Sequence, residues 1–447
     1  MLRRDVLGGG VSLAVAGAGS AVAGPAPELL ANPRELQSRT DRLRADPSVE
    51  IRRIGASARG APIELISLGS GPRDALIVGC PHPNEPVGCL TVEALIGRLR
   101  RDPAAGHGFR WHFIKAIDPD GLELNRSWLK GPRTPERYFD GFFRPAFDRQ
   151  PEYSFPLKAG AYGFDRSTPE NQAWRAALEL TRPAFQASLH NADYGGAFYL
   201  LSRPLPGLAE ALSRQPAEAG LTVNPVGEPF ADFAPFRPGV FAFPDIAAAA
   251  AAGAWSAGDS SAGYAAARYG TFSLVSEVPF WDDARLRDGA PSGRTLGEVV
   301  AMLAVWNAEC AAVLAASLPR LDARGPDAAD LRAALDEALA AARGQEAKLR
   351  RLAGAPMLSG PLAVKDLAVN ATLLRLVSLR AYAMLARLAA LSSPGPASQT
   401  AHAVAASHLR QGLGDLRAEA RLRIVPLDVL VGLQTQAVLT TAAMLAA

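Results

Sequence analysis

The chain has 447 residues, of which 49% are hydrophobic and 20% charged, a composition that is typical of a globular protein and excludes a disordered one. Its formal net charge of +3 gives no indication of nucleic-acid binding. The length allows two domains, and three cysteines are too few for a disulfide framework.

The first 23 residues have the features of a signal peptide. Arg3 and Arg4 form a basic start, residues 6–22 are weakly apolar, and Ala21-Val22-Ala23 fits a cleavage site. The paired arginines indicate the twin-arginine route. We therefore expect export to the periplasm or secretion, with a mature chain that begins near Gly24. A disordered N-terminus on a cytoplasmic protein is the alternative.

Residues 51–68 alternate in polarity and predict a hairpin, which is followed by a buried strand at 75–78. A helix is predicted over 87–101. His82 and Glu85 lie on the turn between that strand and that helix, where open α/β sheets bind ligands. A histidine and a carboxylate three residues apart can both reach one Zn²⁺. For this motif alone, a solvated loop is the alternative.

Two later strands are predicted to carry further polar residues at their ends. Residues 185–190 end in His190, and residues 269–279 carry Glu277. A lone acid in a buried strand is costly unless it is paired or catalytic. A catalytic zinc needs three protein ligands and a nearby base, so these strand ends supply the missing candidates. Cys80, beside the first motif, is most simply a small buried residue, with zinc ligation as the alternative.

The order of these motifs resembles the zinc metallocarboxypeptidases, the carboxypeptidase A family, over roughly residues 50–290. The matching features are H-x-x-E after an early strand, Asp118-Pro119-Asp120-Gly121 after the next strand, and a later histidine and glutamate at strand ends. Asp118 stands where the family has Asn. The resemblance implies an α/β fold with a mixed, mostly parallel sheet flanked by helices.

The resemblance also implies roles for individual residues. One zinc ion would be held by His82, Glu85 and His190, and Glu277 would act as general base. For the substrate, the matching residues are Arg166 as the preferred carboxylate clamp, Arg126 as the second choice, Asn125, and Tyr264; Arg133 and Arg144 stay open as oxyanion partners.

From about residue 295 the composition shifts to Ala, Leu and Arg with helical spacing, which predicts an all-α bundle of four to five helices. The expected domains are a signal peptide at 1–23, a catalytic domain at 24–292 and a helical domain at 293–447. The last segment is apolar, but Asp428 and Gln434 favour a packed helix, so we expect no stable membrane span after signal removal. A homo-oligomer interface or a lid are the roles we consider for this domain.

The expected function is a zinc-dependent carboxypeptidase that hydrolyses a C-terminal peptide bond. One alternative is an amidohydrolase that deacylates N-acyl amino acids, similar to the aspartoacylase and succinylglutamate desuccinylase branch. Another is a peptide-binding relative without turnover. The expected partner is therefore a peptide or a small acyl-amino-acid, with no nucleic acid.

Overall fold

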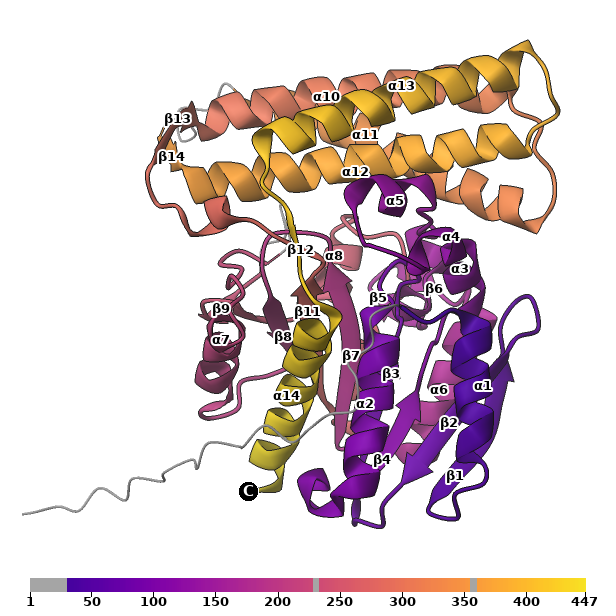
Figure 1. The fold of residues 1–447 in the computed structure, drawn as a ribbon, viewed down its shortest axis with the longest axis vertical. Helices are drawn as coiled ribbons and strands as arrows, with labels where there is room; N and C mark the ends of the chain where they lie inside the picture. Colours follow the sequence, from indigo (N-terminus) through magenta and orange to yellow (C-terminus); the bar gives the residue numbers. More distant parts are fainter. Residues whose placement is uncertain (1–29, 228–232, 354–359) are drawn as a thin grey trace, which may run out of the picture.

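Figure 1 shows an α/β unit with a bundle of long helices across one end, in a computed structural model that describes residues 30–227, 233–353 and 360–447. The predicted signal peptide, residues 1–23, lies outside the described residues. Within them, the segments Leu296–Arg320 and Leu427–Ala446 are long and apolar enough to cross a membrane by length and composition.

The α/β unit is built on a mixed sheet, which has nine strands in the described ranges, in the order β1-β2-β4-β3-β7-β11-β8-β10-β9. The four central strands β4, β3, β7 and β11 run parallel to one another. Their outer neighbours β2 and β8 are antiparallel to them, β1 is antiparallel to β2, and β10 is parallel to β8. The strand bounds are β1 Val49–Ala56, β2 Pro62–Leu68, β3 Arg73–Gly79, β4 Phe109–Ile114, β7 Phe185–Ala192, β8 Phe198–Leu201, β9 Pro235–Arg237, β10 Val240–Ala242 and β11 Phe272–Pro279. This arrangement confirms the predicted fold class.

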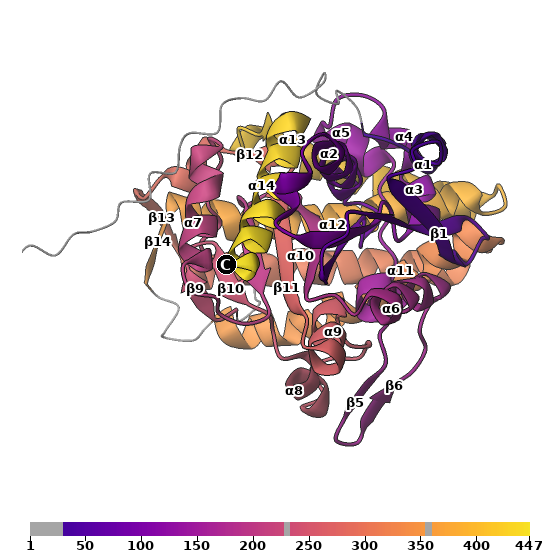
Figure 2. The same cartoon turned by 90° about the horizontal axis from the view of Figure 1, so that it is seen from below.

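Helices cover both faces of the sheet (Figure 2). On one face lie α2 (Val87–Arg101), α7 (Leu208–Glu218) and α14 (Leu427–Ala446), and α14 packs against the other two and β11. On the opposite face lie α6 (Pro169–Thr181) and α9 (Ser261–Tyr269). Because both faces are covered, the central strand β3 contains a continuous apolar run, Ala75-Leu76-Ile77-Val78.

The alternation of side chains along β3 explains this run. Ala75 and Ile77 belong to the apolar cluster on the α2 side, whereas Leu76 and Val78 belong to the cluster on the α6 side. All four are fully buried. The turn that carries His82 and Glu85 therefore leaves a strand that is fixed on both faces.

The long helices form a bundle that lies across one end of the α/β unit (Figure 1). They are α10 (Leu296–Ser317), α11 (Pro326–Ala353), α12 (Val364–Leu391) and α13 (Pro396–Glu419). The remaining α-helices and strands of the described residues are α1 Pro33–Leu43, α3 Pro119–Leu124, α4 Arg126–Leu129, α5 Pro135–Asp140, α8 Ile246–Ala251, β5 Leu157–Ala159, β6 Tyr162–Phe164, β12 Trp281–Asp282, β13 Pro291–Thr295, β14 Pro361–Ala363 and β15 Arg423–Ile424.

The last helix of the predicted helical domain, 293–447, packs on the α/β unit and not on the other helices of that domain. After α13 the chain returns to the α/β unit through β15, which pairs with β12. The last helix, α14, then packs on α2 and β11 rather than in the bundle. Its Gln434 side chain is fully buried and donates to the backbone carbonyls of His190 (2.8 Å) and Ser276 (3.2 Å). An apolar helix with such a polar residue fits the sheet face as well as it fits a bundle, so its spacing alone does not distinguish them.

Asp118 caps the short helix α3 directly after β4. Its Oδ1 accepts the backbone N–H of Gly121 at 2.8 Å. Burial of the carboxyl and the charge of Glu170 raise the pKa of Asp118 to about 8 from its ordinary 3.8. A carboxyl whose pKa is raised on folding destabilises the folded state increasingly as the pH rises from about 4 to about 8.

Asp118→Asn should therefore stabilise the protein, since Asn also caps helices well and carries no charge to bury. We expect the free energy of unfolding to rise by about 2–4 kcal/mol at pH 8 and by little at pH 4. Denaturant unfolding of both proteins across this pH range measures the difference. An equal effect at both ends of the range would contradict the buried-carboxyl explanation.

Candidate metal centre

The turn between β3 and α2 is held against β7 by close backbone packing. A Cβ atom on Gly88 would lie 2.7 Å from the carbonyl oxygen of Leu189, so only glycine allows the first turn of α2 to come this near. Asn191 adds a direct link, because its Oδ1 accepts the N–H of Val87 at 3.1 Å. The start of α2 is thus fixed beside His190.

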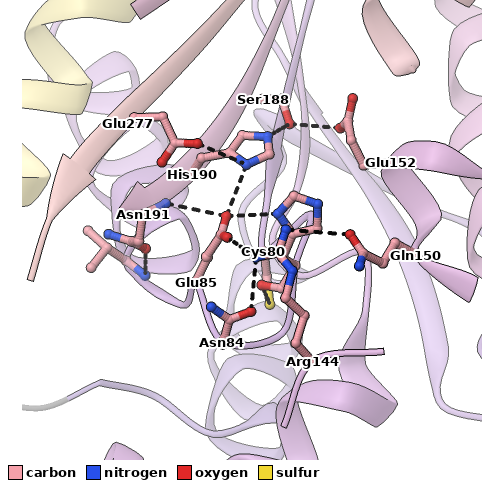
Figure 3. Close-up of polar contacts among 12 residues, drawn as sticks. Cys80, Asn84, Glu85, Arg144, Gln150, Glu152, Ser188, His190, Asn191 and Glu277 are labelled. Carbon is pink, nitrogen blue, oxygen red and sulfur yellow. Dashed lines mark hydrogen bonds and ion pairs between the residues drawn. The ribbon is translucent and has the colours of Figure 1, made fainter. Parts of the chain in front are cut away.

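This packing brings the three predicted metal ligands together. The Nδ1 atoms of His82 and His190 lie 3.0 and 2.9 Å from the same oxygen of Glu85, Oε2. The ligand atoms of the three residues all lie within 4.8 Å of one another, and all three residues are buried. Figure 3 shows Glu85 at the centre of these contacts. Side chains more than a hundred residues apart therefore converge on one point.

The chemistry of this donor set fits a zinc ion. Two imidazole nitrogens and one carboxylate are a ligand set of catalytic zinc sites. Burial and the charge of Arg144 lower the pKa of His82 to about 3, which leaves its ring neutral and able to bind a cation. Burial opposes protonation of His190, but the hydrogen bond that it donates to Glu85 and the charge of Glu277 outweigh the effect of burial and raise the pKa of His190 to about 9. The same negative surroundings favour a divalent cation at this point.

A second layer of hydrogen bonds orients His190. Its Nε2 lies 3.0 Å from the Ser188 hydroxyl, which donates to Glu152 Oε2 at 3.1 Å. Because that hydroxyl proton is committed to Glu152, the hydroxyl accepts from Nε2–H and leaves Nδ1 as the ligand atom. Glu152 is fixed in turn by the backbone N–H and the hydroxyl of Ser261. Strand alternation places Ser188 on the same side as His190, but no sequence signal pointed to Glu152.

Glu277 lies beside this group, as predicted for the general base. On β11 it is level with His190 on the parallel neighbour β7. Its Oε1 is 3.6 Å from His190 Nδ1, and the side chain is buried. The Glu277 carboxylate therefore lies near the atoms that would hold the metal. The hydrogen bonds of the two histidine Nδ1 atoms go to Glu85.

Among the described residues, the arginine bonded to the ligand group is Arg144. Its Nη1 lies 2.5 Å from Glu85 Oε1 and 3.3 Å from Asn84 Oδ1, and its Nη2 lies 3.5 Å from Gln150 Oε1. The side chain is 21% exposed, so the guanidinium is still partly accessible. From the sequence, Arg144 is predicted only as one of two arginines that could stabilise the oxyanion.

The preferred clamp arginines are not brought to the ligand group. Arg166 is 67% exposed and pairs with Asp148 at 3.4 Å, and Arg126 is 59% exposed and pairs with Glu123 at 3.0 Å. Arg133 is buried and donates to a backbone carbonyl of the segment before α14. The predicted roles of these arginines therefore have no support in the contacts of the described residues.

The side chains of Asn125 and Tyr264, two predicted substrate-binding residues, contact neighbouring groups of the protein. The Asn125 amide donates to the carbonyls of Gly121 and Phe143, while its oxygen accepts from Trp128 Nε1 and the N–H of Phe143. All of its hydrogen-bonding capacity is used within its own loop, so these contacts give no support to its predicted substrate-binding role, which stays a prediction.

Tyr264 packs its ring against Phe155, with 5.0 Å between ring centroids, in the apolar cluster on the α6 side of the sheet.

Cys80 is fully buried, and burial raises the pKa of its thiol well above the usual value. A buried neutral thiol is a poor zinc ligand compared with the nearby histidines.

Aromatic rings cover the ligand group on the His82 side. The Tyr153 ring stacks on the His82 ring with 5.6 Å between centroids. Phe147 and Trp255 pack against Tyr153, each at 5.4 Å. Phe147 is 40% exposed, so this aromatic group extends from His82 to the surface.

No protein-family model matches the chain, and no curated protein matches it in sequence. Solved structures do match in part. The metallo-carboxypeptidase from Burkholderia cenocepacia is 20% identical over 56% of this chain and 60% of its own length, with a TM-score of 0.33. A Shewanella amazonensis protein, provisionally described as a metallopeptidase, is 14% identical over 55% of this chain and 84% of its own, with a TM-score of 0.39.

A third solved structure is bovine thrombin-activatable fibrinolysis inhibitor in complex with tick carboxypeptidase inhibitor. It is 14% identical over 56% of this chain and 86% of its own, with a TM-score of 0.33. These proteins are distant from this chain, and their similarity assigns it no activity.

Replacing either histidine should remove the metal. We expect His82→Ala and His190→Ala to lower the zinc content of the purified protein from about one ion per chain to near zero, because two ligands alone hold zinc weakly. Elemental analysis after dialysis measures the content. The exposed His402 on α13 provides the matched control, His402→Ala, which should keep its zinc. Full zinc content in both ligand variants would contradict the assignment.

Proposed function

We propose that this chain is a zinc-dependent hydrolase of the carboxypeptidase type, which cleaves the C-terminal amide bond of a peptide. The observation that carries the proposal is the convergence of His82, Glu85 and His190, with the carboxylate of Glu277 beside them. A structural zinc site usually has four protein ligands, whereas three ligands with a neighbouring carboxylate are typical of hydrolytic sites.

The side chains of the site have distinct tasks in this reaction. A zinc ion at this site would supply Lewis acidity to the substrate carbonyl and to the attacking water. Glu277 takes the proton from that water and returns it to the leaving amine. Glu152 and Ser188 keep the His190 ring turned so that Nδ1 faces the centre.

Arg144 supplies the positive charge that a carboxypeptidase needs. Its guanidinium offers several N–H donors in one plane and can bind a carboxylate or a developing oxyanion. Since Arg144 is bonded to Glu85, a substrate oxygen held by its remaining donors would lie next to the ligand group.

The aromatic cover favours a second candidate, hydrolysis of N-acyl amino acids. Tyr153 stacks directly on His82, and Phe147 and Trp255 enclose Tyr153. Such a cover suits a small substrate with an apolar acyl group better than a long peptide. Both candidates use the same three ligands and the same base. For either candidate we propose that the enzyme acts after export from the cytoplasm, because the first 23 residues have the features of a signal peptide.

A substrate panel distinguishes the candidates, and Glu277→Gln tests the base. We expect hydrolysis of N-blocked dipeptides with a free C-terminus, loss of activity with a chelator and recovery with Zn²⁺. Glu277→Gln should lower kcat by about 10²–10⁴-fold while the zinc content stays the same. Preference for N-acyl amino acids would favour the second candidate. No turnover of any amide by the zinc-loaded protein would leave only a binding function.

The role of Arg144 can be tested against an arginine of the same region. Arg144→Gln should lower kcat/KM by about 10²-fold or more, because a charged donor next to the reacting group is lost. Arg166→Gln should change it less than twofold, since that side chain is exposed and paired elsewhere. Steady-state kinetics of both variants give the comparison. The reverse order of effects would restore Arg166 as the clamp.

A further inference from the structure

A continuous chain of hydrogen bonds joins the helical bundle to the turn between β3 and α2, which carries His82 and Glu85 and is called the metal-ligand turn below. Arg380 on α12 donates to Asp193 Oδ2 from Nη2 (2.7 Å) and Nε (3.2 Å). The Tyr138 hydroxyl donates to Asp193 Oδ1 at 2.7 Å and accepts from Asn84 Nδ2 at 3.3 Å. Asn84 Oδ1 accepts from Arg144 Nη1 at 3.3 Å. Helix α12 is therefore linked to the residue next to Glu85.

The chemistry of the links fixes the direction of every bond in the chain. A carboxylate only accepts, so the Tyr138 hydroxyl must donate to Asp193. The Tyr138 oxygen is then an acceptor, which turns the NH₂ end of Asn84 toward it. The carbonyl end of Asn84 consequently faces Arg144, where an NH₂ group would meet another donor. The charge on Asp193, which Arg380 balances, thus selects the orientation of Asn84.

The middle of this hydrogen-bond chain is shielded from water, whereas the side chains at its two ends, Arg380 and Arg144, are 23% and 21% exposed. Asn84 and the side chain of Asp193 are 0% exposed, and Tyr138 is 1% exposed. A link lost in such surroundings is not replaced by solvent, and the remaining polar groups stay unsatisfied or rearrange. A change at Arg380 should therefore be transmitted along the chain.

Other side chains of the bundle hold the same loop. Arg387 on α12 donates to the carbonyls of Gly141, Phe142 and Leu124, each at 2.8 Å. Glu337 on α11 accepts the backbone N–H of Phe147 at 2.7 Å. These contacts lie on both sides of Arg144 in the sequence. The bundle consequently fixes the backbone from which Arg144 reaches Glu85.

We propose that Arg380 is a positioning residue for the metal centre, acting through Asp193, Tyr138 and Asn84 on Arg144 and Glu85. The helical bundle is then a working part of the site rather than an independent appendage. This inference rests on the proposed function, because it requires that Glu85 binds a metal ion. It assigns to the bundle a task that its sequence, which carries no catalytic motif, does not indicate.

Zinc affinity of the full-length protein, measured by competition with a chromophoric chelator, tests the inference. We expect Arg380→Gln to weaken zinc binding by about 10-fold or more, as loss of a residue that supports a ligand does. The control is Arg417→Gln. Arg417 on α13 pairs with Glu136 across the same two units, but the pair is exposed and outside the chain, so its loss should change the affinity less than twofold.

Since Arg380→Gln leaves a buried carboxylate without its partner and could prevent folding, Tyr138→Phe provides a second test that keeps the ring and removes only the hydroxyl. It should also weaken zinc binding, and the double variant should be no weaker than the worse single variant, because the two residues act in series. Tyr199→Phe is the matched control, since the buried Tyr199 hydroxyl has no hydrogen-bond partner among the described residues.

The visible absorption spectrum of the Co²⁺-loaded protein reports the coordination geometry at the metal site. The visible bands should shift in Arg380→Gln and Tyr138→Phe and stay unchanged in the two controls. Folded variants with wild-type zinc affinity and wild-type bands would overturn the inference while leaving the proposed function intact. A wild-type protein that binds no zinc would overturn both.

Discussion

The structure depends on one buried contact, in which a single carboxylate oxygen of Glu85 lies 3.0 and 2.9 Å from the imidazoles of His82 and His190. Two of these side chains come from the turn after β3 and the third from the neighbouring parallel strand β7. Such a concentration of ionisable groups is costly to bury unless the groups compensate one another or bind an ion. Much of the surrounding packing serves to hold them together.

The support comes from segments that are far apart in the sequence. Gly88 lets α2 approach β7, and Asn191 bonds the first residue of α2. Gln434 on the last helix donates to the carbonyls of His190 and Ser276 and accepts from Thr91 on α2. One side chain from the C-terminus thus links the two central strands and the helix that follows the metal-ligand turn.

The fold class and the convergence of the three candidate metal ligands could be predicted from the sequence because both depend on local patterns. Each of His82, Glu85, His190 and Glu277 stands at the end of a strand or on the turn that follows one, and strand ends in a parallel sheet meet at one edge. The position of Arg144 could not be predicted in this way. It lies in an irregular segment that is held by residues of α11 and α12 about 190 to 250 positions later.

Asn125 and the last helix, α14, show why residue type and spacing alone are insufficient. Asn125 has the residue type expected of a substrate-binding pair, but type alone does not show that the backbone of its own loop uses every polar atom. The apolar spacing of α14 is equally compatible with a bundle and with a sheet face. For α14 the deciding partners are α2 and β11, which are distant in sequence, so only the three-dimensional contacts identify them.

X-ray absorption at the zinc edge of the purified protein tests the central claim most directly. The account predicts one zinc ion with two imidazole nitrogens at about 2.0–2.1 Å, carboxylate oxygen at about 2.0–2.2 Å and no sulfur ligand. A protein without zinc, or a spectrum with sulfur at about 2.3 Å from a cysteine such as Cys80, would contradict it.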